Sequence, residues 1–284
     1  MPQHPSATAR QAREALAARL RDLRLDVGIS GRELAVRCAW SESKTSRIEN
    51  ARTQPSDADI RSWCVACHAA DRSEDLVAAN RQSTEANVEW RRLQRSGLRN
   101  LQEAGAPLYE RTARFRAYCS DVVPGFLQTP DYATALLTSI ASFRGTRHDV
   151  EEAVAARLRR NRVVHEDRRQ FFLVMEESVL RYRIGDDRTM SAQLDHLLSF
   201  TARPHVNLGV IPFSAVRTMW PLPTFTVFDA ERVHADTLDA AVTLTQPSQV
   251  DLYARAFDLL ARHSVRGESA RKLISDAAER LRRA

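Results

Sequence analysis

The stretch from Gly28 to Ser56, "GISGRELAVRCAWSESKTSRIENARTQPS", decides the fold of the first part of the chain. Ser30 and Ser56 each stand three residues before an acidic residue, which matches the capping box found at helix starts. Ser41 is a third candidate for an N-cap. Together with the preceding sequence, these starts predict four helices, over about 9–27, 31–38, 42–50 and 57–68.

The second and third of these helices are separated only by Ala39, Trp40 and the cap itself. A turn this short keeps two helices from packing antiparallel, and so it predicts a helix-turn-helix. Apolar residues at helical spacing supply the inner stripe of a small bundle. They are Leu16, Leu20, Leu23, Leu34, Ala35, Cys38 and Ile48.

The segment "WCVACH", Trp63 to His68, has the spacing C-x-x-C-H. It fits covalent haem attachment, half of a zinc site, or one face of an ordinary helix. Ile60, Trp63, Cys64 and Cys67 follow the i, i+3, i+4, i+7 pattern of a buried helix face, and a reduced cysteine behaves as a small hydrophobe. We therefore expect both cysteines in the core and predict no metal.

This N-terminal region resembles the phage-repressor-type helix-turn-helix of the xenobiotic-response-element regulators. The residues that carry the resemblance are Ser30, Glu33, Leu34, Ala35, Ser41, Ser46, Ile48 and Glu49. The sequence departs from the family pattern at Ala39 and Ala51, where glycine is common. If either position requires a positive φ, alanine is strained there.

The resemblance implies that residues 42–50 form the recognition helix, which enters the major groove of double-stranded DNA. Arg47 is the best candidate for a bidentate contact to guanine, Ser43 can bond either base type, and Glu42 can accept from cytosine. Lys44 is assigned to a base or a phosphate. Arg52, just beyond the helix, is assigned to a phosphate.

The composition is compatible with this interpretation. The chain of 284 residues is 43% hydrophobic and has a formal charge of +6, so it can bury a substantial core and permits an anionic partner. We find no secretory signal and no run of about 18 apolar residues. We therefore expect a soluble cytoplasmic protein, associated with the nucleoid through its DNA and without a membrane partner, whose four cysteines are reduced.

The rest of the chain predicts a connector helix and an α+β domain. In the connector, over 81–106, Trp90, Leu93, Leu98 and Leu101 share a stripe, so it packs either on its own C-terminal domain or on a second subunit. Beyond it we expect a helix after the N-cap Thr129, a helix over 149–169 and a strand within 170–185. A helix over 190–202, two or three further strands and two final helices follow. The predicted domains are 1–80, 81–106 and 107–284.

This C-terminal part, in "YERTARFRAYCSDVVPGFLQTPDYATALL" and "HVNLGVIPF", resembles the domain of unknown function that follows such DNA-binding domains in many actinobacterial regulators. Some members are described as antitoxin-like regulators encoded beside a small partner protein. The resemblance implies a DNA-binding regulator, expected to be a homodimer on an operator, whose larger domain binds a ligand or that partner. The segment Pro124 to Pro130, "PGFLQTP", is explained structurally by a turn and a helix cap.

The sequence does not favour an enzyme. It has no glycine-rich phosphate loop, no G-x-S-x-G and no H-E-x-x-H motif. Neighbouring residues such as His165 with Glu166, or Asp195 with His196, point in different directions on a helix. We expect no catalytic residue and no cofactor. One arginine run could hold an acidic protein partner or touch DNA, but we interpret it as a solvated face. Its members are Arg157, Arg159, Arg160, Arg162, Arg168 and Arg169.

Overall fold

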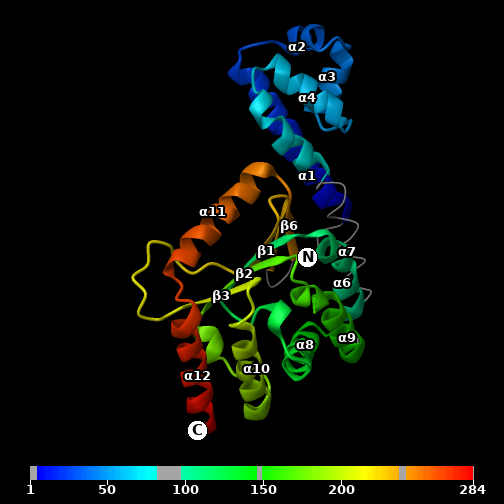
Figure 1. Cartoon of the computed structure of the whole chain (residues 1–284). Helices are drawn as coiled ribbons and strands as arrows, with labels where there is room; N and C mark the ends of the chain where they lie inside the picture. The colour runs from blue at the N-terminus through cyan, green and yellow to red at the C-terminus, as the bar shows by residue number, and fades with distance from the viewer. Residues whose placement is uncertain (1–4, 82–96, 146–148, 237–240, 284) are drawn as a thin grey trace. The chain divides into compact units, whose positions relative to one another are not determined.

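The computed structural model describes residues 5–81, 97–145, 149–236 and 241–283. The described residues form two compact units, drawn with their element labels in Figure 1. The first unit comprises residues within 1–91 together with 245–249, and the second comprises residues within 92–244 and 250–284.

The N-terminal unit is a bundle of short helices around one core. Residues 73–81 are helical, and the other elements are α1 (Pro5–Asp26), α2 (Gly31–Arg37), α3 (Glu42–Glu49), α4 (Asp57–Ala66) and the 3-10 helix η1 (Ala70–Arg72). The predicted inner stripe is buried, except that Cys38 is only half-buried and packs against the core. The four predicted helices are therefore confirmed, with shifted ends.

The largest shift at a C-terminus is in α4, which ends at Ala66 and not at His68. Cys67 is the C-cap, and His68 has a φ of 54°. A left-handed residue cannot continue a right-handed helix, so the chain turns away at His68.

The C-terminal unit is built on one mixed sheet of six strands in the order β3-β2-β1-β4-β5-β6. The first three strands along the chain run parallel, and the remaining pairings are antiparallel. The strands are β1 (Arg114–Cys119), β2 (Gln170–Glu176), β3 (Val206–Ile211), β4 (Phe225–Phe228), β5 (Arg232–Asp236) and β6 (Ala241–Leu244).

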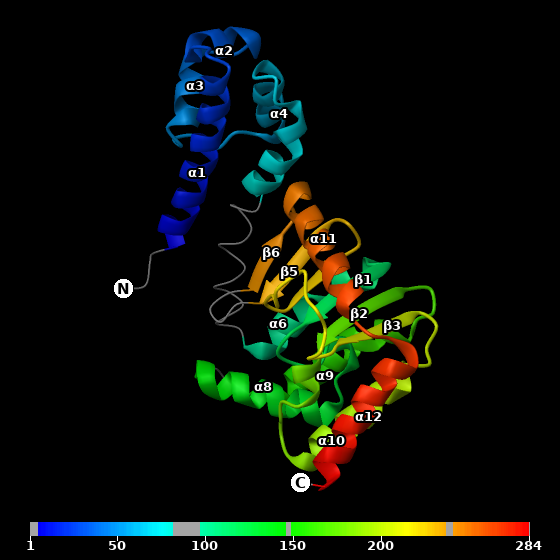
Figure 2. The ribbon, with the colours of Figure 1, turned by 90° about the vertical axis from the view of Figure 1, so that its left-hand side faces the viewer.

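Both faces of this sheet are covered, which explains why "FFLVM" in β2, Phe171 to Met175, is apolar on both sides. One face carries Phe115, Leu173 and Val210 and packs against α10 and α12. The opposite face carries Tyr118 and Val174 and packs against α11. Figure 2 shows α10 and α12 side by side, with α11 elsewhere on the sheet.

The helices of this unit surround the sheet. They are α6 (Leu98–Ala104), α7 (Ala106–Arg111), α8 (Pro130–Arg144), α9 (Val150–Asn161), α10 (Asp187–Phe200), α11 (Pro247–His263) and α12 (Gly267–Arg283). Three-residue and four-residue 3-10 helices punctuate the connections, at η2 (Gly125–Leu127), η3 (Arg162–His165) and η4 (Glu177–Leu180). The expected fold class, a helix-turn-helix bundle followed by an α+β domain, is confirmed.

Two predicted elements are longer in the prediction than in the structure. The strand expected within 170–185 ends at Glu176, because the chain enters η4 and buries Val179 and Leu180 in the core. The helix expected over 149–169 ends at Asn161 and passes into η3. Strands β1 and β5 were not predicted as strands, because polar residues interrupt their apolar pattern.

The connector helix predicted over 81–106 lies partly outside the described residues, which include neither Trp90 nor Leu93. Within the described part, α6 places Leu98 and Leu101 in an apolar cluster with α8 and α9 of the same unit. The Asp149 carboxylate accepts hydrogen bonds from the N–H groups of Leu98 and Arg99, at 3.2 and 2.9 Å. This end of the connector therefore packs on its own C-terminal domain.

The arginine run is not uniformly a solvated face. Arg169 is 2% exposed and donates hydrogen bonds to the carbonyls of Tyr109, Glu110 and Thr112 at the end of α7. Arg160 lies over the ring of Tyr109, 4.3 Å from its centroid. Arg169, just before β2, and Arg160, on α9, therefore both hold α7 in place, which corrects the sequence-based expectation for both.

The segment "PGFLQTP" is held by buried side-chain amides. Gln193 accepts from the Thr129 N–H at 2.8 Å and donates to the Leu127 carbonyl at 2.7 Å. Thr129 caps α8, as predicted, by accepting from the N–H of Tyr132. The turn and the cap thus have a structural role.

Candidate nucleic-acid interface

Each helix of the helix-turn-helix begins at a serine that caps it. The Ser30 Oγ accepts from the Glu33 N–H at 3.1 Å, and the Ser41 Oγ accepts from the Lys44 N–H at 3.3 Å. Ser56 and Asp59 form a complete capping box at the start of α4. These caps satisfy N–H groups that a helix start leaves unpaired, and so they fix where α2, α3 and α4 begin.

The turn between α2 and α3 contains a left-handed alanine. Ala39 has a φ of 56°, and Ala51, just after α3, has a φ of 54°. Both are positions where the sequence comparison anticipated glycine, so the anticipated strain is confirmed. The indole N–H of Trp40 donates to the Thr45 hydroxyl at 2.8 Å and holds the turn against α3.

Helix α3, which the sequence predicts to be the recognition helix, has two distinct faces. Thr45 and Ile48 are buried in the bundle. Glu42, Ser43 and Arg47 are exposed. The helix therefore presents three of the predicted contact residues on a solvent-facing side.

A partly buried ion pair fixes the end of α3. The Arg24 Nε lies 2.5 Å from a Glu49 carboxylate oxygen, and the same guanidinium donates to the Ile29 carbonyl at 2.7 Å. Arg24 comes from α1 and is buried. It thus locks α1, the entry to α2 and the end of α3 together. In the sequence, the only indication of this role for Arg24 is that a charged residue stands next to the apolar stripe of Leu20 and Leu23.

Lys44 differs from its neighbours because it has intramolecular partners. Its ammonium lies 2.5 Å from the Asp59 carboxylate and 4.4 Å from the centroid of the Trp40 ring. Partial burial raises the pKa of Asp59, but the hydrogen bonds from Lys44 and Ser56 outweigh it and hold that pKa below its usual value. The Lys44 ammonium is thus already engaged with partners inside the N-terminal unit.

Two further residues lie on the exposed side of α3. Ser46 is exposed, and the Asn50 side-chain amide donates to the Ser46 carbonyl at 2.8 Å. Sequence reasoning did not assign either to DNA, although both follow the i, i+4 spacing from Glu42. Arg52, beyond α3, is exposed as well.

The cysteines of "WCVACH" lie in the core of this unit. Cys64 and Cys67 are buried, as the helical spacing predicted, and burial raises the pKa of the Cys64 thiol to about 11. A thiol with a raised pKa stays protonated near neutral pH and is a poor metal ligand. Within the part of the chain that the structure describes, no three His, Cys, Asp or Glu residues are placed to hold a metal ion.

The described helices include none that is both long enough and apolar enough to cross a membrane.

Comparison with known proteins identifies two domains. A helix-turn-helix domain model matches residues 15–77, which contain α2, α3 and α4. A model described as a domain of unknown function (DUF5753) matches residues 107–276, more than half of the chain. No curated protein and no solved structure matches the chain. The helix-turn-helix domain suggests a DNA-binding regulator, and the chain belongs to the family defined by this domain of unknown function.

Proposed function

We propose that this protein is a sequence-specific transcriptional regulator of the xenobiotic-response-element type found in actinobacteria. It binds a two-fold-related operator as a homodimer, with α3 in the major groove. Its C-terminal domain senses a ligand or binds a small partner protein. We assign DNA binding to residues 1–80, a connector helix to 81–106 and the binding of a ligand or partner to 107–284.

The observation that supports this proposal most directly is that α3 has one exposed polar face and one face buried in the bundle. Glu42, Ser43 and Arg47 are exposed, and their side chains make no hydrogen bond or ion pair among the described residues. The other face of the helix is fixed by the core and by Glu49. An exposed polar face on a rigidly held helix is what base readout requires, because rigidity limits the entropy lost on binding.

The five predicted contacts keep their roles in this proposal. Arg47 reads guanine, Ser43 and Glu42 read base edges, and Arg52 contacts a phosphate. Lys44 contacts DNA only after exchanging Asp59 for a phosphate or a base.

In vitro selection of random duplex DNA with the purified full-length protein tests the proposal. We expect an enriched inverted repeat that retains its advantage over a scrambled duplex at physiological salt. Equal and weak binding of both duplexes, lost together as salt rises, would indicate only counterion release and contradict specific recognition.

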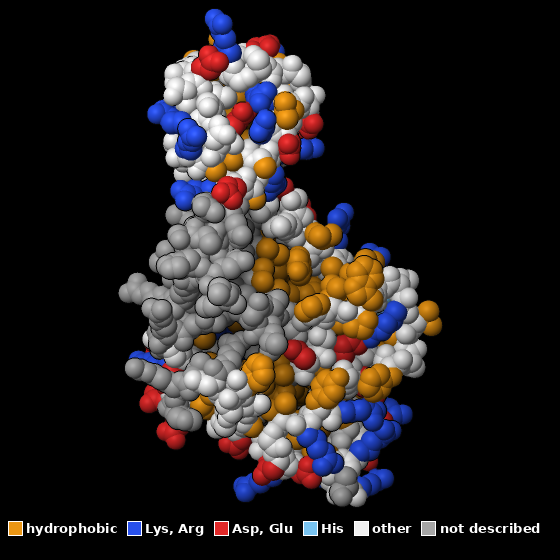
Figure 3. All heavy atoms as spheres, turned by 180° about the vertical axis from the view of Figure 1, so that it is seen from behind, with side chains coloured by type: hydrophobic (Ala, Val, Ile, Leu, Met, Phe, Trp, Pro, Cys, Tyr) orange, Lys and Arg blue, Asp and Glu red, His pale blue; other side chains and the backbone are white. Residues whose placement is uncertain are grey.

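An antitoxin-like role, in which the main task is to restrain a small protein, is favoured by the segment between β3 and β4. Phe213, Val216 and Trp220 are 65%, 90% and 68% exposed. The segment is fastened by hydrogen bonds from the Phe213 N–H to Glu177 and from the Thr218 N–H to His263. Figure 3 shows hydrophobic side chains gathered on one face of the C-terminal unit. Rigid, exposed aromatic residues are typical of protein interfaces.

This alternative is tested by purifying the native protein from its own cell and measuring any stoichiometric small protein. Trp220→Ser should abolish that recovery, whereas Phe143→Ser should preserve it, because Phe143 is equally exposed but lies on α8. Equal recovery with both variants would exclude this surface.

A further inference from the structure

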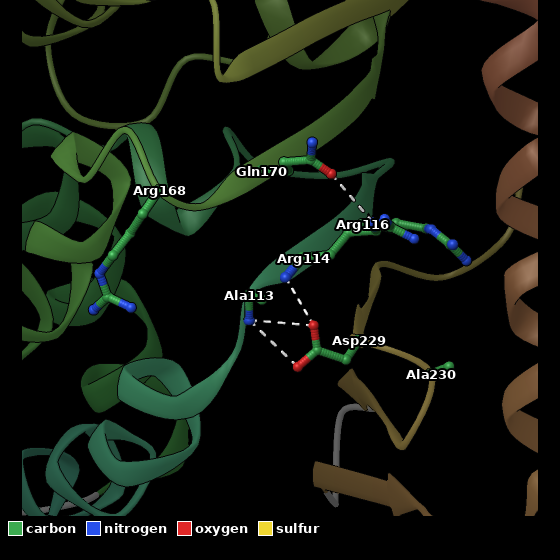
Figure 4. A pocket seen from close by; sticks show the side chains of 7 residues that line it. All are labelled: Ala113, Arg114, Arg116, Arg168, Gln170, Asp229 and Ala230. Carbon is green, nitrogen blue, oxygen red and sulfur yellow. Dashed lines mark hydrogen bonds between the residues drawn. The ribbon is translucent and has the colours of Figure 1, made fainter.

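A shallow cavity of about 400 Å³ opens at the amino-terminal end of β1 and β2. Its charged and polar lining is Arg114, Arg116, Arg168, Gln170 and Asp229. Figure 4 shows these side chains around the opening, with Arg114 and Arg116 from β1, Gln170 from β2 and Asp229 from the turn after β4.

The one carboxylate among these residues is directed to the backbone. Asp229 accepts from the N–H groups of Ala113 and Arg114, at 3.2 and 2.8 Å, and it is held there by a left-handed backbone with a φ of 51°. It forms no ion pair with a guanidinium among the described residues. Asp229 is therefore paired with none of the arginines, and the three arginines leave the lining with a net positive charge.

Arg168 already has an acidic partner, because its guanidinium lies 2.6 Å from Glu166. In Figure 4 it extends on the opposite side of the opening from Arg116. It adds to the positive field but is not the centre of the site.

Arg114 and Arg116 lie at the centre of this candidate site. Two residues apart on a strand, they project from the same face with Cα atoms about 7 Å apart. Arg114 donates to the Gln170 side chain at 3.3 Å. Arg116 is half-buried and has no hydrogen bond or ion pair among the described residues. Neither has a carboxylate partner in that part of the chain.

Two adjacent guanidinium groups on a central strand repel each other, and an anion between them removes that repulsion. Each presents a planar fork of donors that matches a phosphate or a carboxylate. A phosphomonoester carries a charge of about −1.5 to −2 at neutral pH, which balances the pair better than a single carboxylate. The cavity also has room for an organic group beyond the phosphate.

We propose that Arg114 and Arg116 form a binding site for the phosphate group of a small phosphomonoester. This ligand class specifies what the C-terminal domain senses, and to that extent the inference rests on the proposed function.

Calorimetric titration of the full-length protein, prepared without phosphate or sulfate, tests the site. The probes are glycerol 3-phosphate, inorganic phosphate and succinate. We expect saturable binding of glycerol 3-phosphate, and weaker binding of both inorganic phosphate and succinate. Arg114→Gln and Arg116→Gln should each weaken the affinity about tenfold or more, and Arg116→Lys should restore only part of it.

Arg183→Gln is the matched control, because Arg183 is an exposed arginine of the same unit that pairs with Asp187, away from the cavity. It should bind as the unchanged protein does. Absence of saturation with glycerol 3-phosphate, equal affinity for succinate, or equal losses in all three glutamine variants would overturn the proposal. Thermal unfolding of each variant separates a lost site from a lost fold.

The titration contains no DNA. Failure to select an operator would therefore count against the proposed regulator and leave the phosphate-binding result standing. Conversely, an operator bound with specificity by a protein that takes up no phosphomonoester would refute only the ligand site.

Discussion

The Lys44 ammonium of α3 is held 2.5 Å from the Asp59 carboxylate of α4. Asp59 also completes the capping box of α4 through its bond with the Ser56 N–H, at 3.1 Å. One carboxylate thus couples the start of α4 to the one basic residue in the first turn of α3. In the proposed complex with DNA, this pair would set whether the Lys44 charge is available to the phosphates.

Asp59→Asn should release Lys44 toward the phosphates. A neutral amide still supports the cap but no longer pairs with an ammonium. We expect the plot of log affinity against log salt to become steeper by about one unit, as for one added phosphate contact. The double variant Lys44→Gln/Asp59→Asn should return to the original slope. If Asp59→Asn leaves the salt slope unchanged, release from Asp59 does not add a phosphate contact by Lys44, and this prediction is wrong.

Arg47→Ala should cost about 1 to 3 kcal/mol of operator binding and relax the preference at one base pair, because a bidentate guanine contact is lost. Binding to a panel of single-base operator variants measures this. Arg52→Ala is the comparison, and it should weaken all sequences alike and reduce the salt slope by about one. A uniform loss in Arg47→Ala would reassign Arg47 to the backbone.

Ala39→Gly should stabilise the N-terminal unit by about 1 kcal/mol, because glycine adopts a φ of 56° without the steric cost of a Cβ. Chemical denaturation followed by tryptophan fluorescence measures the change. Ala18→Gly, at an exposed position inside α1, should destabilise by about 1 kcal/mol. Destabilisation by both changes would argue against a left-handed residue in the turn.

Arg169→Lys should destabilise the C-terminal unit by about 3 kcal/mol. A lysine cannot bond the three carbonyls at the end of α7 together with Glu166, so buried acceptors are left unpaired. Arg168→Lys, one residue earlier and exposed, should change stability by less than about 0.5 kcal/mol. Similar unfolding midpoints for the two variants would refute the structural role of Arg169.

Stability should also depend on pH through His234. Burial, with smaller effects from Arg232 and Arg160, lowers the pKa of His234 to about 4. The unfolded chain takes up this proton near the ordinary pKa of about 6.5. The stabilising contribution is therefore complete above about pH 6.5 and is lost as the pH falls toward 4.

We expect this loss to amount to about 3 kcal/mol, and His234→Phe should remove it. Urea unfolding at a series of pH values measures the difference between the two proteins. Parallel pH profiles would contradict the burial of a neutral imidazole at this position.

Much of the helix-turn-helix was predictable because its signals are local. Ser30, Ser41 and Ser56 cap helices through N–H groups only three residues away, and the leucine and cysteine stripes follow the helical period. Even the strain at Ala39 follows from a local rule about glycine. The exposed positions of Glu42, Ser43 and Arg47 follow from the same period.

The rest depended on contacts between residues distant in sequence. Nothing within α3 indicates that Lys44 pairs with Asp59 or that Glu49 pairs with Arg24. Likewise, strand β1 is recognisable only beside β2 and β4, because its outward arginines break the apolar pattern.

The sequence by itself therefore determined the helices of the N-terminal unit, their caps and the turn that makes them a helix-turn-helix, since these rest on hydrogen bonds and periodicities within a few residues. Only the tertiary structure decided which charges are already paired and which are not. It pairs Arg169 with buried carbonyls and places Arg114 and Arg116 together beside a cavity. The physical reason is that Arg169 gains its carbonyl partners, and Lys44 its carboxylate partner, only when folding brings a segment distant in sequence next to the charged side chain.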